Sequence, residues 1–187
     1  MSLKHYVWAL VCVLAWPAHA HITLEQKQAE AGSYYKATFK VGHGCEGSAI
    51  KQIVVTIPNG VLGAKPMPKA GWQIEIEKTK LAQPYLSHGK KIEETVSVVR
   101  WTGGPLPDAY YDEFVLSVRL PEQVGPLYWS VSQICEQGRI DWTEVPTPGK
   151  KRSDYAAPAP VLEIVPKADS VKPVLPAAKS SHEHHSH

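Results

Sequence analysis

The sequence predicts an all-β protein, an antiparallel β-sandwich of the Greek-key type. About seven or eight short segments with alternating or β-branched side chains recur at intervals of roughly 8–12 residues. Glycine, proline and asparagine separate them, as in the turns between strands. No window shows the 3.6-residue periodicity of an amphipathic helix. Together these observations favour two packed antiparallel sheets.

The clearest strand is the segment 34–41, in which apolar and polar side chains alternate with a period of two. We expect strands at 21–26, 34–41, 50–58, 72–79, 95–101, 112–121, 127–136 and 138–146. Residues 42–49 form a glycine-rich loop, and 61–71 form a connection that contains two prolines. Residues 81–94 are expected to form a loop or an exposed hairpin.

The chain divides into a signal peptide at 1–20, a β-sandwich at 21–146 and a tail at 147–187. Lys4 and His5 precede an eleven-residue apolar run, and the Ala-His-Ala sequence that follows is typical of signal-peptidase cleavage between Ala20 and His21. The run is too short to cross a bilayer, which takes about 20 residues. The rest of the chain contains no apolar run of about 18 residues. We therefore expect an exported protein, periplasmic or secreted, that does not span a membrane after processing.

The tail from 147 to 187 is rich in proline, alanine, lysine and serine, a composition that cannot bury enough apolar surface to offset its ordering entropy. We predict that it is disordered. Its last residues carry four histidines, which we expect to bind Cu(II), Ni(II) or Zn(II) weakly: His182, His184, His185 and His187.

Charge and cysteine content narrow the class of protein. The formal net charge of +2 creates no field that would select nucleic acid or an anionic membrane. Cys12 lies in the signal peptide, so Cys45 and Cys135 remain as an even pair in an oxidising compartment. A structural disulfide is the favoured interpretation, and a two-thiolate Cu(I) site is the alternative.

Cleavage after Ala20 would place a free α-amino group and an imidazole on the same residue, His21. Through the amine nitrogen and Nδ1, such a residue can chelate a metal, and nitrogen donors of this kind suit tetragonal Cu(II). A third donor would be a carboxylate. Asp112 and Glu113 are adjacent at the start of a strand, so that their side chains point to opposite faces and one of them could face a site.

Five segments resemble the YcnI-like family of exported copper-binding domains: HITLE, AGSYYKATFKVGHGCEGSAIKQIVVTIP, PKAGWQIEIEK, VVRWTGGPLPDAYYDEFVLSVRLP and LYWSVSQICEQGRIDWTEVP. The resemblance covers 21–146 in order. The GHGC and QICE sequences of this chain resemble the proteobacterial branch of the family, in which these two cysteines pair. The resemblance implies an immunoglobulin- or cupredoxin-like sandwich. It also implies a Cu(II) site called a mono-histidine brace, with an amino-terminal histidine, a glutamate and a nearby tryptophan.

Carried onto this chain, the resemblance makes His21 and Glu113 the metal ligands and Trp142 the nearby tryptophan. Asp108 is the alternative carboxylate, and Trp129 is the alternative tryptophan. His43, in the GHGC loop, could approach the metal, but we expect it to be structural.

The expected function is that of a periplasmic copper chaperone or buffer that is not an enzyme. The resemblance implies membrane copper transporters or other periplasmic copper chaperones as partners. One alternative is a copper-dependent polysaccharide monooxygenase, which needs a second histidine for which the domain offers only His43 and His88. The other alternative is a metal-free adhesion or interaction sandwich.

Overall fold

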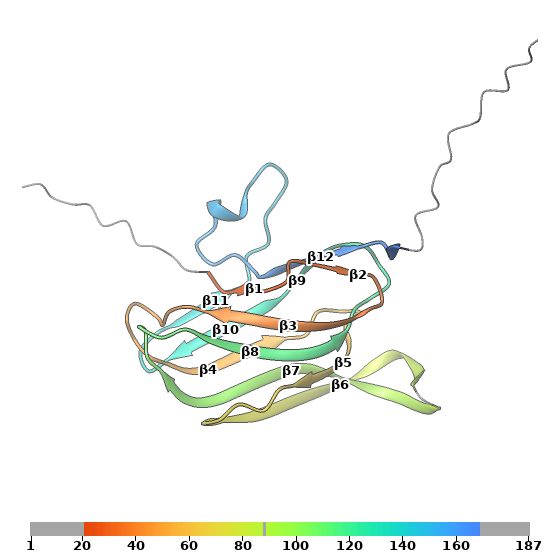
Figure 1. The fold of residues 1–187 in the computed structure, drawn as a ribbon, viewed down its shortest axis with the longest axis horizontal. Coiled ribbons are helices and arrows are strands. Elements are labelled where there is room, and N and C mark those ends of the chain that lie inside the picture. The colour runs from red at the N-terminus through yellow and green to blue at the C-terminus, as the bar shows by residue number, and fades with distance from the viewer. Residues whose placement is uncertain (1–20, 88, 169–187) are drawn as a thin grey trace, which may run out of the picture.

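The computed structural model describes residues 21–87 and 89–168, which form two β-sheets packed face to face and a smaller third sheet (Figure 1). One main sheet has the strand order β1-β3-β8-β5, and all its pairs are antiparallel. Its strands are β1 (Thr23–Leu24), β3 (Tyr34–Val41), β8 (Asp112–Arg119) and β5 (Leu62–Pro66).

The other main sheet has the order β11-β10-β4-β7-β6 and is also antiparallel throughout. Its strands are β11 (Arg139–Trp142), β10 (Ser130–Cys135), β4 (Ile50–Thr56), β7 (Lys90–Leu106) and β6 (Trp72–Ser87). The chain passes directly from one main sheet to the other between β3 and β4, between β4 and β5, between β5 and β6, and between β7 and β8. These crossings confirm the predicted antiparallel β-sandwich.

The third sheet corrects the predicted end of the domain at Pro146. It has the order β2-β12-β9, with strands β2 (Gln28–Glu30), β12 (Val161–Val165) and β9 (Gly125–Tyr128). Leu162 and Ile164 of β12 are buried in the common core, and a short 3₁₀-helix, η1 (Arg152–Asp154), precedes this strand. The prediction of disorder was therefore wrong for 147–168, because the short alternating segment VLEIV is masked by the composition around it.

Some predictions concern parts of the chain outside the described residues. They are the signal peptide at 1–20, the disorder of 169–187 and the metal binding of the four tail histidines, His182, His184, His185 and His187. Among the described residues, no helix is long and apolar enough to cross a membrane.

Some strand boundaries also differ from the sequence interpretation. Residues 62–66 were predicted to be a connection, yet they form β5; it lies at the edge of its sheet, where proline is tolerated because a missing ladder donor costs little. The expected strand at 127–136 is divided between β9 and β10, which belong to different sheets. Of the loop or exposed hairpin predicted at 81–94, the structure forms the hairpin, which belongs to the long β6–β7 pair and extends beyond the body of the sandwich (Figure 1).

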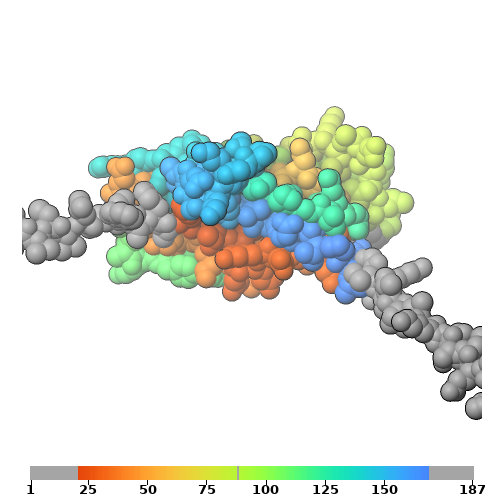
Figure 2. Space-filling view, turned by 90° about the horizontal axis from the view of Figure 1, so that it is seen from above, coloured from red at the N-terminus to blue at the C-terminus, as the bar shows by residue number. Residues whose placement is uncertain are grey.

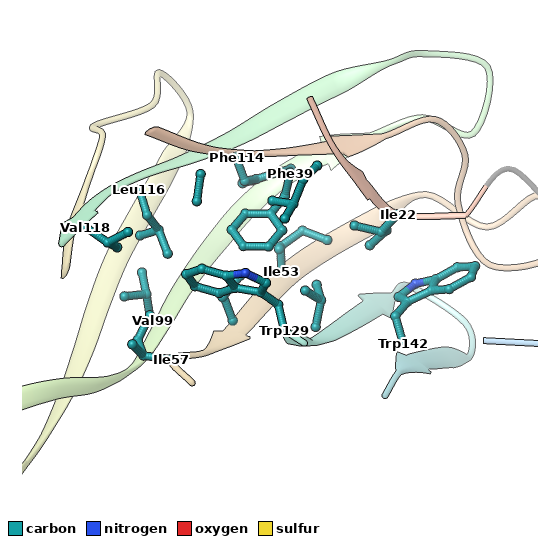
Figure 3. Packing of buried hydrophobic residues seen from close by; sticks show 14 of the residues in the cluster. Ile22, Phe39, Ile53, Ile57, Val99, Phe114, Leu116, Val118, Trp129 and Trp142 are labelled. Atoms are coloured by element: carbon teal, nitrogen blue, oxygen red, sulfur yellow. The ribbon is translucent and has the colours of Figure 1, made fainter. Parts of the chain in front are cut away.

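Aliphatic and aromatic side chains together fill the space between the two main sheets (Figure 3). Phe114 packs edge-on against Trp101, with ring centroids 5.5 Å apart, and against Trp72 at 4.9 Å. Phe39 packs against Trp129 at 5.4 Å. Such edge-to-face pairs contribute roughly 0.5–1.5 kcal/mol each beyond the burial of their surface.

Cys45 and Cys135 form the predicted disulfide, with their Cα atoms 6.0 Å apart. This pairing excludes the alternative two-thiolate site. The bond joins the loop after β3 to the end of β10 across a sequence separation of 90. In the chain-entropy model, closing so long a loop stabilises the fold by roughly 4–5 kcal/mol.

Candidate metal centre

His21 lies just before β1 and packs its imidazole against the indole of Trp142. The ring centroids are 5.6 Å apart, and the rings meet edge-on at 65°. Trp142 is the last residue of β11 and is only 1% exposed, whereas His21 is partly exposed. The structure therefore places the first residue after the predicted cleavage site beside a buried tryptophan.

The topology explains why these two distant residues meet. β1 is the edge strand of one main sheet, and β11 is the edge strand of the other. The contact between His21 and Trp142 therefore bridges the two sheets at one open side of the sandwich, where β1 and β11 lie near each other (Figure 1). The segment between β11 and β12 covers this region (Figure 2), and its Arg152 lines a small pocket of about 220 Å³ together with His21.

A second imidazole, that of His43, lies on the same indole. Its ring centroid is 6.3 Å from that of Trp142, at an angle of 72°. His43 Nδ1 lies 2.6 Å from the Gly44 carbonyl oxygen. Because a carbonyl only accepts hydrogen bonds, Nδ1 is the donor, and in the neutral ring Nε2 then carries the lone pair. This Nε2 is buried and has no hydrogen-bond partner among the described residues.

Gln133 connects Trp142 to the loop that carries His43. The indole Nε1 of Trp142 donates to Gln133 Oε1 at 3.1 Å, and Gln133 Nε2 donates to the His43 carbonyl oxygen at 2.8 Å. The same Nε2 lies 3.9 Å from Cys45 Sγ and 4.0 Å from Cys135 Sγ. Gln133 is 1% exposed, so its amide is an interior polar group whose oxygen and nitrogen both have partners. Gln133 could not be predicted from the sequence, because a single glutamine in a strand carries no local signal.

Glu113, the predicted carboxylate ligand, lies on β8 opposite Lys40 of β3, which in turn lies opposite Thr23 of β1. Residues in register point to one face of a sheet, so Glu113 and Thr23 share a face with one strand between them. The Tyr111 hydroxyl donates a hydrogen bond to Glu113. Desolvation, together with this carboxylate, raises the pKa of Tyr111 to about 12.

The other two carboxylates considered from the sequence, Asp112 and Asp108, each accept a hydrogen bond from another residue. Asp112 Oδ1 accepts a hydrogen bond from Lys69 Nζ at 2.5 Å. Asp108 Oδ1 accepts one from the Gly44 backbone N–H at 2.7 Å, and it lines a pocket of about 600 Å³ together with His43. Asp108 is therefore held next to the His43 loop.

Trp129, the alternative tryptophan, lies in the middle of the core, where it is fully buried against Phe39. Figure 3 draws it in the middle of the packed cluster and draws Trp142 at one end. Of these two tryptophans, the structure brings Trp142 to His21.

Across 21–87 and 89–168, no three histidine, cysteine, aspartate or glutamate side chains are grouped closely enough to hold a metal ion. The nitrogen donors gathered at Trp142 are two imidazoles, and cleavage before His21 would add an α-amine. The buried lone pair at His43 Nε2 is the kind of unsatisfied acceptor that a metal ion would fill. These nitrogen donors would fit a metal ion if cleavage before His21 added the α-amine to them.

Comparison with known proteins identifies the family and the fold. Residues 21–164 match the family model described as "Domain of unknown function (DUF1775)". A comparison with curated proteins finds no match. The chain is similar to an uncharacterized protein from Nocardia farcinica, whose crystal structure is described as revealing an immunoglobulin-like fold. The two share 23% identity over 77% of this chain and 97% of the other, with a TM-score of 0.59. That identity supports the fold alone, and the family match shows that the chain belongs to the DUF1775 family.

Proposed function

We propose that this protein is a periplasmic Cu(II)-binding protein of the YcnI-like kind, which buffers copper or passes it on as a chaperone. The observation that carries the proposal is the packing of His21 against the buried Trp142. After cleavage, the α-amine and Nδ1 of His21 form a two-nitrogen chelate suited to Cu(II). The indole of Trp142 excludes water from one side of the ion and tunes its surroundings.

Glu113 is the proposed oxygen donor. It lies on the same face of the sheet as Thr23, and Thr23 follows His21 by two residues. Asp108 is the alternative, since its backbone partner Gly44 adjoins the second imidazole. Either carboxylate would leave the copper with an open coordination position, through which a partner can exchange the ion. Membrane copper transporters or other periplasmic copper chaperones are the proposed partners, and the tail histidines raise the local copper concentration.

Export supports this assignment as well. The proposed signal peptide ends at Ala20, directly before the histidine that the site requires, and the disulfide between Cys45 and Cys135 suits an oxidising compartment. In such a compartment copper is available as Cu(II), for which nitrogen and carboxylate donors are appropriate ligands.

The test is a copper titration of two proteins that differ only at their amino termini. One begins at His21, and the other carries Gly-Pro before it, which converts the α-amine of His21 into an amide. Because the proline nitrogen carries no proton to lose, the new α-amine cannot form a fused chelate with the imidazole. Both end at Ala168, because truncation at Pro146 would remove the buried strand β12. We expect the extension to weaken Cu(II) binding by about 100-fold or more, because a chelate becomes a single imidazole. Equal affinities and equal electron paramagnetic resonance (EPR) spectra would refute the amino-terminal site, and no tight binding by either protein would favour a metal-free interaction sandwich.

A copper-dependent polysaccharide monooxygenase is the second candidate, and the position of His43 beside Trp142 favours it, because such enzymes use two histidines. The copper-loaded protein would be incubated with chitin or cellulose, molecular oxygen and ascorbate. Release of oxidised oligosaccharides would support the enzyme. Failure to release them from either polymer would support the chaperone or buffer.

A further inference from the structure

We propose that His43 supplies a second imidazole nitrogen, Nε2, to the ion held by His21. This inference rests on the proposed copper function and extends it to a residue in a different loop. The imidazoles of His21 and His43 both pack edge-on against Trp142, at 5.6 and 6.3 Å between ring centroids. One buried indole therefore gathers two nitrogen ligands that lie 22 positions apart in the sequence numbering.

The hydrogen bonding of His43 prepares it as a ligand. A histidine that binds metal through one ring nitrogen usually donates the other N–H to a carbonyl or carboxylate, which fixes the tautomer and orients the ring. His43 makes this bond from Nδ1 to the Gly44 carbonyl at 2.6 Å. Its Nε2 is then the nitrogen with an available lone pair, and it is the buried atom without a partner among the described residues.

The loop that carries His43 is fixed from three directions. The His43 carbonyl accepts a hydrogen bond from Gln133, the Gly44 N–H donates to Asp108, and Cys45 is tied to β10 by the disulfide. Three restraints on three consecutive residues hold the imidazole in one place. A ligand held in this way loses little conformational freedom when it binds, which increases affinity.

A purely structural role explains these contacts less completely. A structural histidine buried in a core satisfies its polar atoms with partners, and leaving a buried acceptor unmet is costly. The hydrogen bonds from Nδ1 and to the His43 carbonyl hold the loop in place, but neither of them involves Nε2. The same edge of the sandwich also presents the residue that cleavage would convert into a chelate.

The experiment counts imidazoles on Cu(II) in the protein that spans residues 21–168. Copper sulfate is the probe. Electron spin-echo envelope modulation detects the remote nitrogen of each bound imidazole, and two bound imidazoles give combination lines that one does not. We expect two in the unaltered protein and one in His43→Ala, with the affinity of that variant lowered about 10-fold or more. His88→Ala, the same change at the other histidine of 21–168, serves as the matched control and should retain both imidazoles and the affinity.

The outcomes separate this inference from the function on which it rests. A single imidazole in the unaltered protein, with the affinity intact in His43→Ala but lost in the protein extended by Gly-Pro, would overturn the role of His43 and leave the amino-terminal site in place. Absence of tight copper binding by the protein that begins at His21 would overturn both. The imidazole count needs no substitution, so it decides the matter even if His43→Ala fails to fold.

Discussion

Trp129 and Trp142 are equally buried, at 0% and 1% exposure, yet they belong to different kinds of region. Trp129 packs against Phe39 in the middle of the core, and its Nε1 has no hydrogen-bond partner among the described residues. Trp142 lies at an edge of the sandwich, where it contacts two imidazoles, and its Nε1 donates a hydrogen bond to Gln133. Burial alone therefore does not distinguish a tryptophan of the core from one beside the candidate metal ligands, but the groups that surround the ring do.

The largest effect on stability should come from the core tryptophan. Trp129→Ala removes a fully buried indole and leaves a cavity next to Phe39, so we expect the free energy of unfolding to fall by about 3–5 kcal/mol. Denaturant unfolding measures this loss. The copper affinity of the folded fraction should be unchanged, because Trp129 packs in the core and Trp142 is the tryptophan that contacts His21.

Trp129→Phe is the matched control for the indole nitrogen. Since Nε1 of Trp129 has no partner among the described residues, this change should cost less than Trp129→Ala and should leave no buried acceptor unpaired. A copper spectrum altered by Trp129→Phe in a folded protein would break the contrast between the two tryptophans.

An intermediate effect is expected at Gln133, which belongs to the edge region alone. Gln133→Met preserves the length of the side chain but leaves the indole N–H of Trp142 and the carbonyl of His43 without their partner. We expect a loss of about 1–3 kcal/mol in the free energy of unfolding, because buried polar groups are left unsatisfied. If Gln133 positions Trp142 and the His43 loop for the metal, the affinity for Cu(II) should also fall.

Gln52→Met is the control for that substitution. Gln52 lies on β4 of the same sheet and is less buried, and its amide donates to the Thr102 hydroxyl at 2.8 Å. Gln52→Met should have a smaller effect on the free energy of unfolding and no effect on the affinity for Cu(II). Equal effects of the two substitutions on copper affinity would show that Gln133 acts only through general stability.

The contrast between the two tryptophans also explains what the sequence could predict. Strands such as 34–41 were predicted to the residue, because the period-two alternation directly reflects which side chains face the core. The disulfide followed from an even pair of cysteines. By contrast, β12 was missed, because only five residues carry its pattern within a proline-rich segment.

The candidate site was predictable only in part for a related reason. His21 was identified from chemistry that is local to the cleavage site, whereas Trp142 was placed by resemblance to a family. The closeness of His43 and the link through Gln133 depend on two sheet edges and a cross-linked loop meeting in space. No local pattern encodes that meeting.

The smallest effect should come from Asp141, which neighbours Trp142 on β11. Its hydrogen bonds with Arg139 and then with Ser132 hold the pKa of the Asp141 carboxyl below its usual value. The folded state therefore favours the carboxylate, so the stabilisation is complete above the unfolded-state pKa of about 3.9 and is lost as the pH falls through the lowered pKa. The side chain is 44% exposed, so solvent screening keeps the contribution of this carboxylate below about 1 kcal/mol.

Asp141→Asn should accordingly weaken the protein slightly at pH 7 and have no effect at a pH low enough to protonate the folded-state carboxyl. Urea unfolding at both values measures the difference, with Glu136→Gln as a control, since its exposed ion pair with Lys51 is 3.9 Å long and should contribute nothing measurable. Hydrogen exchange locates the loss. Because Asp141 ties β11 to β10 at the sheet edge, faster exchange should be confined to the amides of β11 and the end of β10, while those around Trp129 stay protected. Equal acceleration around both tryptophans would mean that the edge and the core open as one unit, and the site would then have no local flexibility of its own.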